Sequence, residues 1–570
     1  MSVSEQPPAT EAAGSAPAAQ DPAAPGRAPA AQAQAPVTGP AAEIAAGYAF
    51  DGAALDLGAL LWDGACHPDA PIRIPLPVLN RHGLVAGATG TGKTKTLQLI
   101  AEQLSAHGVP VFLADIKGDV SGVSAPGEDG ERVRQRAAEV GQEWRATGFP
   151  CGFYGLGGIG PGIPVRATVT SFGPVLLSKV LQLNRTQEQS LGLIFHYADS
   201  KGLELVDLKD LRAVVAFLVS DTGKAELKGI GGLSTATAGV ILRAITAFEQ
   251  QGAAGFFGEP EFDTGEFLRT AADGRGVVSV LELPAVQDKP QLFPTFLMWM
   301  LADLFNDLPE VGDLEKPKLV FFFDEAHLLF SGASKAFLES ITQTVRLIRS
   351  KGVGVFFVTQ TPKDVPADVL AQLGNRVQHA LRAFTPDDAK ALKAAVRTFP
   401  KSPYDLEEVL TGLGTGEAVV TVLSEKGAPT PVAATRLRAP ESLMGPIDAA
   451  ALDAAVKGSP LYGRYAEAVD RESAYEKLTA EQRAAEAAAL EAAAAKEAEK
   501  AAEKDAEKGA KEAAKEAGKA GARAPRQKEE PSLAEQVVGS GIFKSLTRSI
   551  GTQLGREISR SIFGTARRRR

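Results

Sequence analysis

The strongest chemical pattern in this sequence is Gly87-Ala-Thr-Gly-Thr-Gly-Lys-Thr94, which matches G-x-x-x-x-G-K-[ST]. Glycines in such a loop let backbone N–H groups converge on phosphate oxygens, where a Cβ atom would block the approach. A helix that begins at the end of the loop points its positive dipole end at the same anion. The pattern predicts a nucleotide site in which Lys93 reaches the β- and γ-phosphates and Thr94 ligates Mg²⁺. The residues expected to contact the nucleotide are Gly87, Ala88, Thr89, Gly90, Thr91, Gly92, Lys93, Thr94 and Lys95.

A second pattern is the stretch LVFFFDEAHLLF at 319–330, where apolar residues run directly into Asp324 and Glu325. A carboxylate at the end of a core strand lies beside the phosphate loop in nucleotide-hydrolysing folds. We expect Asp324 to hold Mg²⁺, directly or through water, and Glu325 to polarise the attacking water. A solvated acidic pair at a strand end is ordinary when taken alone. Its combination with the Lys93 loop favours the catalytic interpretation.

Two further strand ends carry polar candidates. Gln360 follows the apolar run VGVFFVT, where a neutral amide could sense the γ-phosphate or orient the water. Asp115 ends the run VPVFLAD and is a candidate for the second shell of the metal. The alternatives are a plain polar strand end for Gln360 and a turn former for Asp115.

An arginine finger, which stabilises charge on the transferring phosphoryl group, has four candidates. Each of them is, by itself, more typical of a surface cation. The candidates are Arg81, Arg346, Arg349 and Arg376.

The elements that must position these residues follow from apolar periodicity. Residues 84–116 predict a strand, a loop, a helix and a second buried strand, which is a βαβ unit. Apolar i, i+3, i+4 spacing predicts mainly helices over 172–309, with one strand at GVVSVLELPAV. We therefore predict an α/β fold with a mainly parallel sheet and a helical insertion between its second strand and the strand that ends in Asp324.

Composition changes mark seven segments along the 570 residues. The Ala/Pro-rich start is expected to be disordered, and the Ala/Glu/Lys tract is expected to be a solvated helical spacer without a coiled-coil seam. The segments are 1–42 disordered, 43–79 a short β-rich lead-in, 80–171 the first part of the core, 172–309 the helical insertion, 310–465 the second part of the core, 466–532 the helical spacer and 533–570 a basic amphipathic tail.

The overall composition narrows the class of protein. A net charge of -8 excludes a basic nucleic-acid coat, so any contact with nucleic acid must come from a local patch. Cys66 and Cys151 are far apart, which argues against a disulfide framework or a zinc site and fits a reducing compartment. We find no run of about 18 apolar residues and no signal-peptide pattern, so we expect a cytoplasmic protein.

The tail has its own pattern, with Ile or Leu at every fourth position from Ile542 to Ile562 and arginines between them and at the end. On a helix this makes an apolar stripe beside a basic face. An anionic membrane, nucleic acid or a neighbouring subunit are candidate contacts, and docking on its own domain is the plain structural alternative.

Five motifs in order resemble the HerA/FtsK superfamily of P-loop ATPases, and more closely the bacterial HerA-helicase-like proteins of the YjgR type. The motifs are NRHGLVAGATGTGKT, FLADIKGD, FFFDEAHLLF, IRSKGVGVFFVTQTP and LGNRVQHALRAFTP, within a resemblance over about 75–475.

This resemblance implies a RecA-like ring motor, a hexamer, that uses ATP and Mg²⁺ at subunit interfaces. Carried over by motif, Lys93, Thr94, Asp324 and Glu325 form the hydrolytic site and Gln360 its sensor. Asp115 matches an acidic strand-end position, Arg349 matches an arginine inserted into a neighbour's site, and Arg81 a second such position. The β-barrel that usually precedes the motor is missing or reduced to about 40 residues, and no clear basic pore loop is present.

We expect Mg-dependent ATP hydrolysis coupled to DNA translocation or remodelling. The alternatives are a nucleotide-dependent oligomeric scaffold and a membrane-associated secretion-type motor. Stimulation of the ATPase by DNA separates the DNA translocase from the scaffold, because a translocase should respond to DNA and a scaffold should not.

Overall fold

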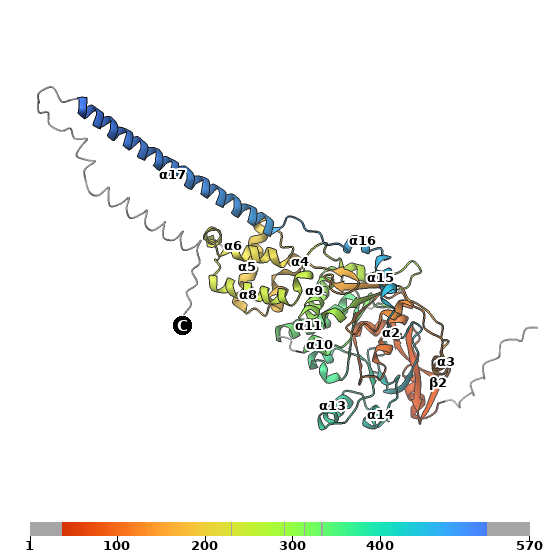
Figure 1. Cartoon of the computed structure of the whole chain (residues 1–570). Helices are drawn as coiled ribbons and strands as arrows, with labels where there is room; N and C mark the ends of the chain where they lie inside the picture. Colours follow the sequence, from red (N-terminus) through yellow and green to blue (C-terminus); the bar gives the residue numbers. More distant parts are fainter. Residues whose placement is uncertain (1–36, 230, 290, 313, 332–334, 521–570) are drawn as a thin grey trace, which may run out of the picture. The chain divides into compact units, whose positions relative to one another are not determined.

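The computed structural model describes residues 37–229, 231–289, 291–312, 314–331 and 335–520. The chain divides into two units, Met1–Glu481 and Gln482–Arg570. The first unit contains a 12-stranded sheet with helices packed around it (Figure 1). The described part of the second unit belongs to helix α17 (Ala474–Ala520), whose first residues lie in the first unit.

The strands follow the sequence in short buried runs. In chain order they are β1 (Ala54–Trp62), β2 (Ala65–Pro75), β3 (Gly83–Ala86), β4 (Val111–Asp115), β5 (Cys151–Leu156), β6 (Ile163–Val165), β7 (Val278–Glu282), β8 (Leu319–Phe323), β9 (Val353–Thr359), β10 (Asn375–His379), β11 (Glu417–Thr421) and β12 (Ala433–Leu437).

The α-helices occupy the intervals between the strands and the end of the first unit. They are α1 (Pro40–Ala46), α2 (Lys93–Ala106), α3 (Glu131–Val140), α4 (Val169–Val180), α5 (Arg185–Lys201), α6 (Leu208–Leu218), α7 (Asp221–Glu226), α8 (Thr235–Gln250), α9 (Leu292–Asp307), α10 (His327–Phe330), α11 (Lys335–Ile348), α12 (Ala367–Leu370), α13 (Pro386–Val396), α14 (Leu406–Gly412), α15 (Ala449–Lys457), α16 (Tyr462–Tyr465) and α17.

The sheet has the strand order β2-β1-β12-β11-β10-β3-β9-β8-β4-β7-β5-β6. From β10 to β6 neighbouring strands pair in parallel, whereas β2, β1, β12 and β11 are joined antiparallel. Strands β3, β4, β7, β8 and β9 are buried at every position, as expected of parallel strands covered on both faces. The chain thus has the predicted α/β core with a mainly parallel sheet.

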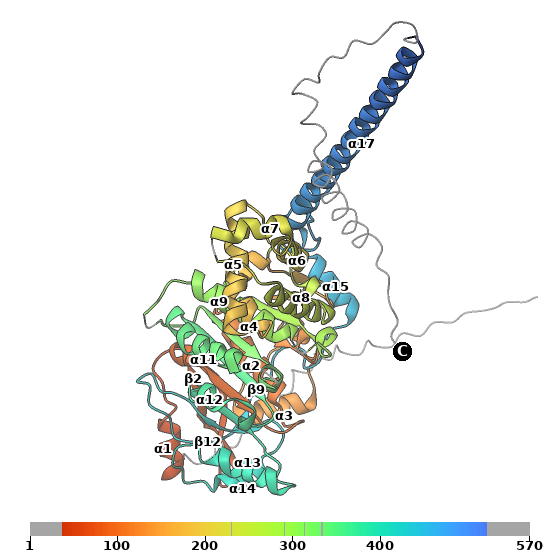
Figure 2. The same cartoon turned by 90° about the vertical axis from the view of Figure 1, so that its left-hand side faces the viewer.

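The predicted helical insertion corresponds to helices α4 to α9. Helices α4, α5, α6 and α8 contact one another, and α4 also contacts α9 and α11, which cover the sheet (Figure 2). The predicted strand inside this region is β7, which lies between β4 and β5 in the sheet. The segment therefore interrupts the chain but returns a strand to the core.

The expectation of disorder over 1–42 is wrong at its end. Residues 1–36 lie outside the described residues, but α1 begins at Pro40, and its Ala41 and Ile44 are buried. These two side chains are three positions apart on one helical face, and α1 contacts β2. The lead-in that follows forms the hairpin β1–β2, which joins the main sheet through β12.

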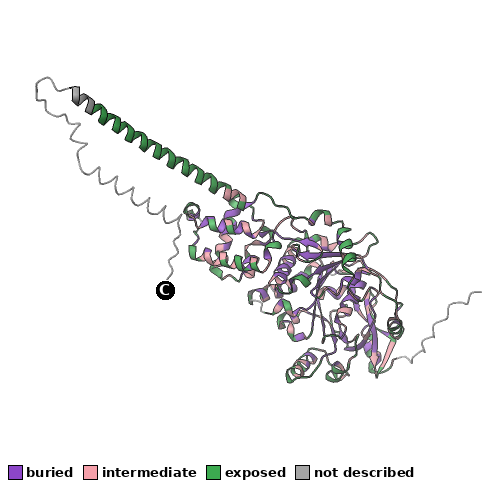
Figure 3. Cartoon of the chain, viewed as in Figure 1, coloured by how far each residue is buried: buried purple, intermediate pink, exposed green. Residues whose placement is uncertain are grey.

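Helix α17 covers most of the tract expected to be a helical spacer. Its described side chains from 482 to 514 are all exposed (Figure 3), as the lack of an apolar stripe predicts. The predicted amphipathic tail at 533–570 lies outside the described residues. Among the described helices, none combines the length and apolar character needed to cross a membrane.

Candidate nucleotide-binding and hydrolysis site

The carboxyl ends of β3, β9, β8, β4 and β7 form one edge of the sheet, because these strands run parallel. The residues that follow them are the predicted site residues. The phosphate loop at 87–95 follows β3, Gln360 follows β9, and Asp324 with Glu325 follows β8. Asp115 ends β4 opposite Glu282, the last residue of β7. The fold thus brings together segments that are up to about 270 residues apart in the sequence.

The phosphate loop needs its glycines for two different reasons. Gly87 has φ +157°, and a Cβ built on it would lie 2.4 Å from the Cβ atom of His379. Gly90 has φ +80° and no atom within 4 Å of such a Cβ, so the loop opens towards free space there. A close approach on one side and an open cradle on the other suit a loop that binds an anion through its backbone.

The two predicted lysines of the loop behave differently. The side chain of Lys93 is buried, and its Nζ donates a 3.1 Å hydrogen bond to the carbonyl oxygen of Ala88. Burial lowers the pKa of Lys93, and the charge of Glu325 opposes this. Lys95 instead donates to Oε1 of Gln98, one turn further along α2 (3.1 Å). Lys93 is thus close enough to Glu325 and Asp324 for their charges to oppose the lowering of its pKa, whereas Lys95 is engaged along its own helix.

His379, at the end of β10, braces the phosphate loop, and the sequence analysis missed it. A 2.8 Å hydrogen bond joins its Nε2 to Oγ1 of Thr96 in the first turns of α2. Burial and the nearby charge of Lys93 lower the pKa of His379 to about 4, so the ring is neutral near pH 7. The neighbouring carbonyl of Ala380 accepts the N–H of Ala88 (2.9 Å). The end of β10 thus fixes both sides of the loop.

Asp324 and Glu325 are both buried, but their surroundings differ. Oδ1 of Asp324 accepts the backbone N–H of Glu325 (2.9 Å), while its buried Oδ2 has no hydrogen-bond partner among the described residues. Glu325 has φ +46°, a strained value for a residue other than glycine. Its Oε1 forms an ion pair with Nζ of Lys117, and its Oε2 lies 3.2 Å from Nδ1 of His327.

These surroundings shift the pKa values of the two acids in opposite directions. Burial raises the pKa of Asp324 to about 6, and the like charge of Glu325 adds to this while Lys117 opposes it. Burial also acts to raise the pKa of Glu325. The hydrogen bond and charge of Lys117 outweigh it and leave that pKa below its ordinary value, with further help from His327 and the amide of Gln360. Glu325 is accordingly an ionised acceptor, whereas Asp324 forms no ion pair with the residues that the structure describes.

Asp115 shapes the loop that carries Lys117. Its Oδ1 accepts the N–H groups of Lys117 (3.2 Å) and Gly118 (2.7 Å), and its Oδ2 accepts that of Val120 (2.8 Å). The sequence analysis considered a turn former as the alternative for Asp115, and these bonds are of that kind. Lys117 itself was overlooked, although it lies in the quoted motif FLADIKGD.

Glu282 provides a test of the electrostatics at this edge. Its Oε1 is buried without a hydrogen-bond partner in the described structure, and burial together with the charge of Asp115 raises the pKa of Glu282 from 4.5 to about 7. A raised acid pKa stabilises the folded state below pH 4.5, and this contribution is lost as the pH rises through 7. We expect Glu282→Gln to be more stable than the parent at pH 8, by up to about 3 kcal/mol, with little difference at pH 4.5. Urea unfolding at the two pH values measures this, and an equal difference at both would contradict it.

Gln360 lies beside a cavity of about 310 Å³ that opens next to the phosphate loop. The cavity is bounded by Ala88 and Thr89 of the loop and by Lys363, Arg382 and Asp388. A second cavity, of about 540 Å³, shares Gln360, Thr361 and Lys363 with it and extends to His327 of α10. We call the two together the loop groove.

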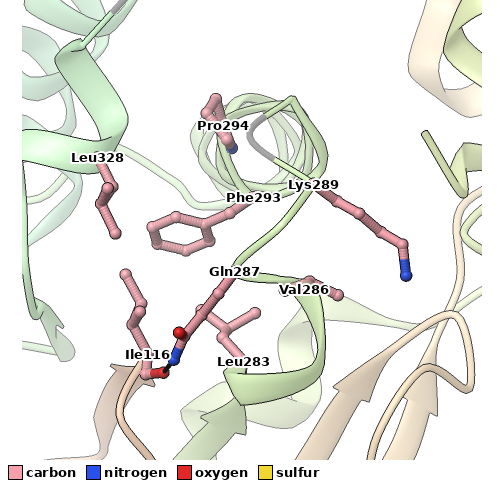
Figure 4. A pocket seen from close by; sticks show the side chains of 8 residues that line it. All are labelled: Ile116, Leu283, Val286, Gln287, Lys289, Phe293, Pro294 and Leu328. Carbon is pink, nitrogen blue, oxygen red and sulfur yellow. Dashed lines mark hydrogen bonds between the residues drawn. The ribbon is translucent and has the colours of Figure 1, made fainter.

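A smaller cavity of about 50 Å³ lies next to the loop of Lys117. It is lined mainly by apolar side chains of the β4 and β7 loops, α9 and α10 (Figure 4). Gln287 donates a 2.5 Å hydrogen bond to the carbonyl oxygen of Ile116 at its edge. The cavity is too small for a nucleotide, and it separates the Lys117 loop from α9.

Of the four arginine-finger candidates, Arg346 lies in α11 and the other three lie at the other edge of the sheet. Arg81 precedes β3, Arg349 precedes β9, and Arg376 is the second residue of β10. Arg376 is engaged, since its Nη1 donates to the carbonyl oxygen of Thr398 (3.0 Å). None of the three lies in the phosphate-loop edge of its own chain, so a finger role would require a neighbouring subunit.

The residues present fit Mg²⁺ and a nucleotide. The open cradle at Gly90, the buried Lys93 and the unpaired Oδ2 of Asp324 face the same edge. No group of three or more His, Cys, Asp or Glu suitable for a metal occurs among the described residues. A cation here would therefore take Asp324, the hydroxyl of Thr94 and oxygen atoms from the nucleotide or water, which are the ligands that Mg²⁺ prefers.

Two curated proteins are similar to parts of this chain. Over 153 residues the chain is 29% identical to the probable helicase MJECL08 of Methanocaldococcus jannaschii, covering 25% of this chain and 28% of that protein. Over 116 residues it is 33% identical to the DNA double-strand break repair helicase HerA of Sulfurisphaera tokodaii, covering 20% and 22%. The matches thus span less than a third of either relative.

Solved structures with similar backbones share little sequence. The plasmid coupling protein TrwB in complex with ADP and Mg²⁺ is 15% identical, with a TM-score of 0.44 over 69% of this chain and 98% of that one. VirB4 of Thermoanaerobacter pseudethanolicus is 15% identical, with a TM-score of 0.42 over 68% and 98%.

The family comparison covers far more of the chain than these pairwise matches. The model for the helicase HerA-like C-terminal family matches residues 63–570, which include the phosphate loop, the acidic pair and Gln360. The chain therefore belongs to the helicase HerA-like C-terminal family of P-loop ATPases.

Proposed function

We propose that this protein hydrolyses ATP in a Mg²⁺-dependent reaction and couples it to movement along or remodelling of DNA, as a ring in which neighbouring subunits complete one another's sites. The observation that carries the proposal is the convergence of Lys93, the acidic pair and Gln360 on one sheet edge. Family membership and the names of the two curated relatives support the choice of reaction and polymer.

The chain's own groups have separate roles in this reaction. The backbone N–H groups of the phosphate loop and the ammonium of Lys93 bind the β- and γ-phosphates and offset developing charge. Bound Mg²⁺ would supply Lewis-acid stabilisation of the phosphoryl oxygens. The carboxylate of Glu325 accepts a hydrogen bond from the attacking water and orients it, and the amide of Gln360 holds Glu325. Arg349, and less securely Arg81, are the proposed fingers for a neighbour's site.

A specific observation favours nucleic acid as the polymer. The loop groove presents the cations Lys363 and Arg382 beside two acids that accept local hydrogen bonds, Asp364 from Thr359 and Thr361 (2.8 and 3.0 Å) and Asp388 from Thr385 (2.9 Å). Phe384, which is 81% exposed, lies beside the groove with the Arg382 guanidinium 5.9 Å from its ring centroid. Cations with an exposed aromatic ring are the groups that bind a nucleic-acid strand through phosphates and base stacking.

The experiment that tests the proposal measures ATPase rate at several protein concentrations, with and without single- and double-stranded DNA. A DNA-translocating ring should show a rate per subunit that rises with concentration and rises again with DNA. An ATPase indifferent to both kinds of DNA would favour the oligomeric scaffold. Flotation with anionic liposomes, with and without residues 541–570, would detect the membrane-associated motor.

Variants of the loop groove test the proposed DNA contact directly. We expect the double variant Lys363→Glu with Arg382→Glu to bind DNA at least tenfold more weakly than the parent, because two phosphate contacts become repulsive. The dependence of log K on log salt should become shallower by roughly 1.5–2. Fluorescence anisotropy with a labelled oligonucleotide measures both. Lys224→Glu with Lys457→Glu changes net charge equally at exposed positions outside the groove and serves as the matched control.

A further inference from the structure

Lys117 has no role in the reaction proposed above, yet its side chain contacts Glu325, the proposed water-orienting residue. Its Nζ forms an ion pair with Oε1 of Glu325, although the Lys117 side chain is 41% exposed and that of Glu325 only 8%. An exposed lysine could satisfy its charge in water, so this pairing with a buried carboxylate is a feature to explain.

The backbone around Lys117 is fixed, so only its side chain has freedom. The carboxylate of Asp115 accepts hydrogen bonds from three backbone N–H groups of the loop, as described above. The side chain of Gln287 donates a hydrogen bond to the carbonyl oxygen of Ile116. Gly118, with φ +73°, packs so closely that a Cβ there would lie 2.9 Å from Cγ of Pro284. The backbone at Lys117 is therefore held in place at the edge of the site, and the position of its ammonium can change only by rotation about the side-chain bonds.

The ion pair has a chemical consequence. Oε1 of Glu325 is engaged by Lys117, and Oε2 is buried beside His327 without a hydrogen-bond partner among the described residues, so neither carboxylate oxygen is open to an attacking water molecule. Lys117 also interacts electrostatically with Asp324 and Lys93, so its ammonium is near both the acidic pair and the phosphate-loop lysine. An anion placed against Lys93 would offer the ammonium of Lys117 a second partner.

We propose that Lys117 is a positioning residue that distinguishes a nucleoside triphosphate from a diphosphate. Without a γ-phosphate it pairs with Glu325 and keeps that carboxylate from orienting water. With a γ-phosphate on the phosphate loop, its ammonium pairs with the phosphate oxygens and releases Glu325. This inference rests on the proposed function and adds a residue that makes Glu325 available only when there is a bond to cleave.

The test compares the affinities of a non-hydrolysable ATP analogue and of ADP, with Mg²⁺, by calorimetry on the full chain. For Lys117→Met we expect the affinity for the ATP analogue to fall about tenfold or more and that for ADP to stay within about twofold. Lys117→Arg should recover part of the preference, because it keeps the charge. Lys457→Met, which removes an exposed lysine paired with Asp453, is the matched control.

The outcomes separate this inference from the proposed function. If Lys117→Met weakens both nucleotides equally, or neither, Lys117 is only a structural partner of Glu325 and the inference is overturned. If the parent binds neither nucleotide, the proposed function fails and takes the inference with it. Should Lys117→Met not fold by circular dichroism, Glu325→Gln breaks the same pair from the other side. That variant should keep or strengthen the preference for the ATP analogue, and a loss of the preference would overturn the inference.

Discussion

Replacing Lys93 with alanine is expected to abolish ATP turnover, with a loss of at least ~10²-fold in rate, as for other single donors that stabilise a charged transition state. Lys93 is buried at the phosphate loop, and burial has already removed much of its hydration. Its ammonium can therefore transfer to phosphate oxygens at little cost. A released-phosphate assay measures the loss, and calorimetry with the ATP analogue should show weaker binding as well.

The control for this variant is Lys457→Ala, which removes an exposed lysine in α15. Folding must be compared too, because Lys93 donates to the carbonyl oxygen of Ala88 and the variant leaves that acceptor without its donor. Thermal unfolding by circular dichroism reports this. Parental turnover in a folded Lys93→Ala variant would show that the loop at 87–95 is not the hydrolytic site.

The second large effect is expected for Glu325→Gln, which should retain nucleotide binding and reduce hydrolysis by ~10²–10⁴-fold. The amide has nearly the same shape as the carboxylate, but it cannot take up a proton from the attacking water. The ion pair with Lys117 is replaced by a weaker hydrogen bond, so the surrounding geometry changes little. Single-turnover measurements with saturating ATP separate this loss of chemistry from a loss of binding.

Asp324→Asn is the informative comparison for Glu325→Gln. Because the unpaired Oδ2 of Asp324 is the position available to a cation, the Asn variant should also raise the Mg²⁺ concentration needed for nucleotide binding, whereas Glu325→Gln should not. If Glu325→Gln hydrolyses ATP at the parental rate, the assignment of the water-orienting base is wrong.

Motifs with local chemistry could be identified from the sequence because each needs only a few adjacent residues. The glycines around Lys93 and the apolar run before Asp324 have this character, and the β3–α2–β4 unit follows from apolar spacing. The expectation of disorder failed at Pro40 to Ala42 because composition alone cannot show that a short helix will find a sheet to pack on.

Contacts between distant segments could not be predicted in the same way. The brace of His379 on Thr96 joins residues 283 positions apart, and the Lys117–Glu325 pair joins two loops through the β8–β4 neighbourhood. Lys117 and His379 both lie in motifs quoted above, but nothing in those motifs indicates which distant residues they contact. Their roles depend on strand order, which nothing in the local spacing specifies.

Local residue order was enough to predict which groups could bind phosphate or carry negative charge, and which runs would form buried strands, because these features depend on neighbouring residues and on apolar periodicity. The contacts between those groups became known only from the folded chain. Parallel pairing places β3, β9, β8 and β4 side by side with their carboxyl ends together. This arrangement brings Lys117 to Glu325 and leaves Oδ2 of Asp324 without a hydrogen-bond partner among the described residues. It also places three of the arginine-finger candidates at the opposite edge, namely Arg81, Arg349 and Arg376. Electrostatic and hydrogen-bond interactions depend on how far apart two groups lie in space. The packing of the whole sheet sets that distance, and spacing along the chain does not.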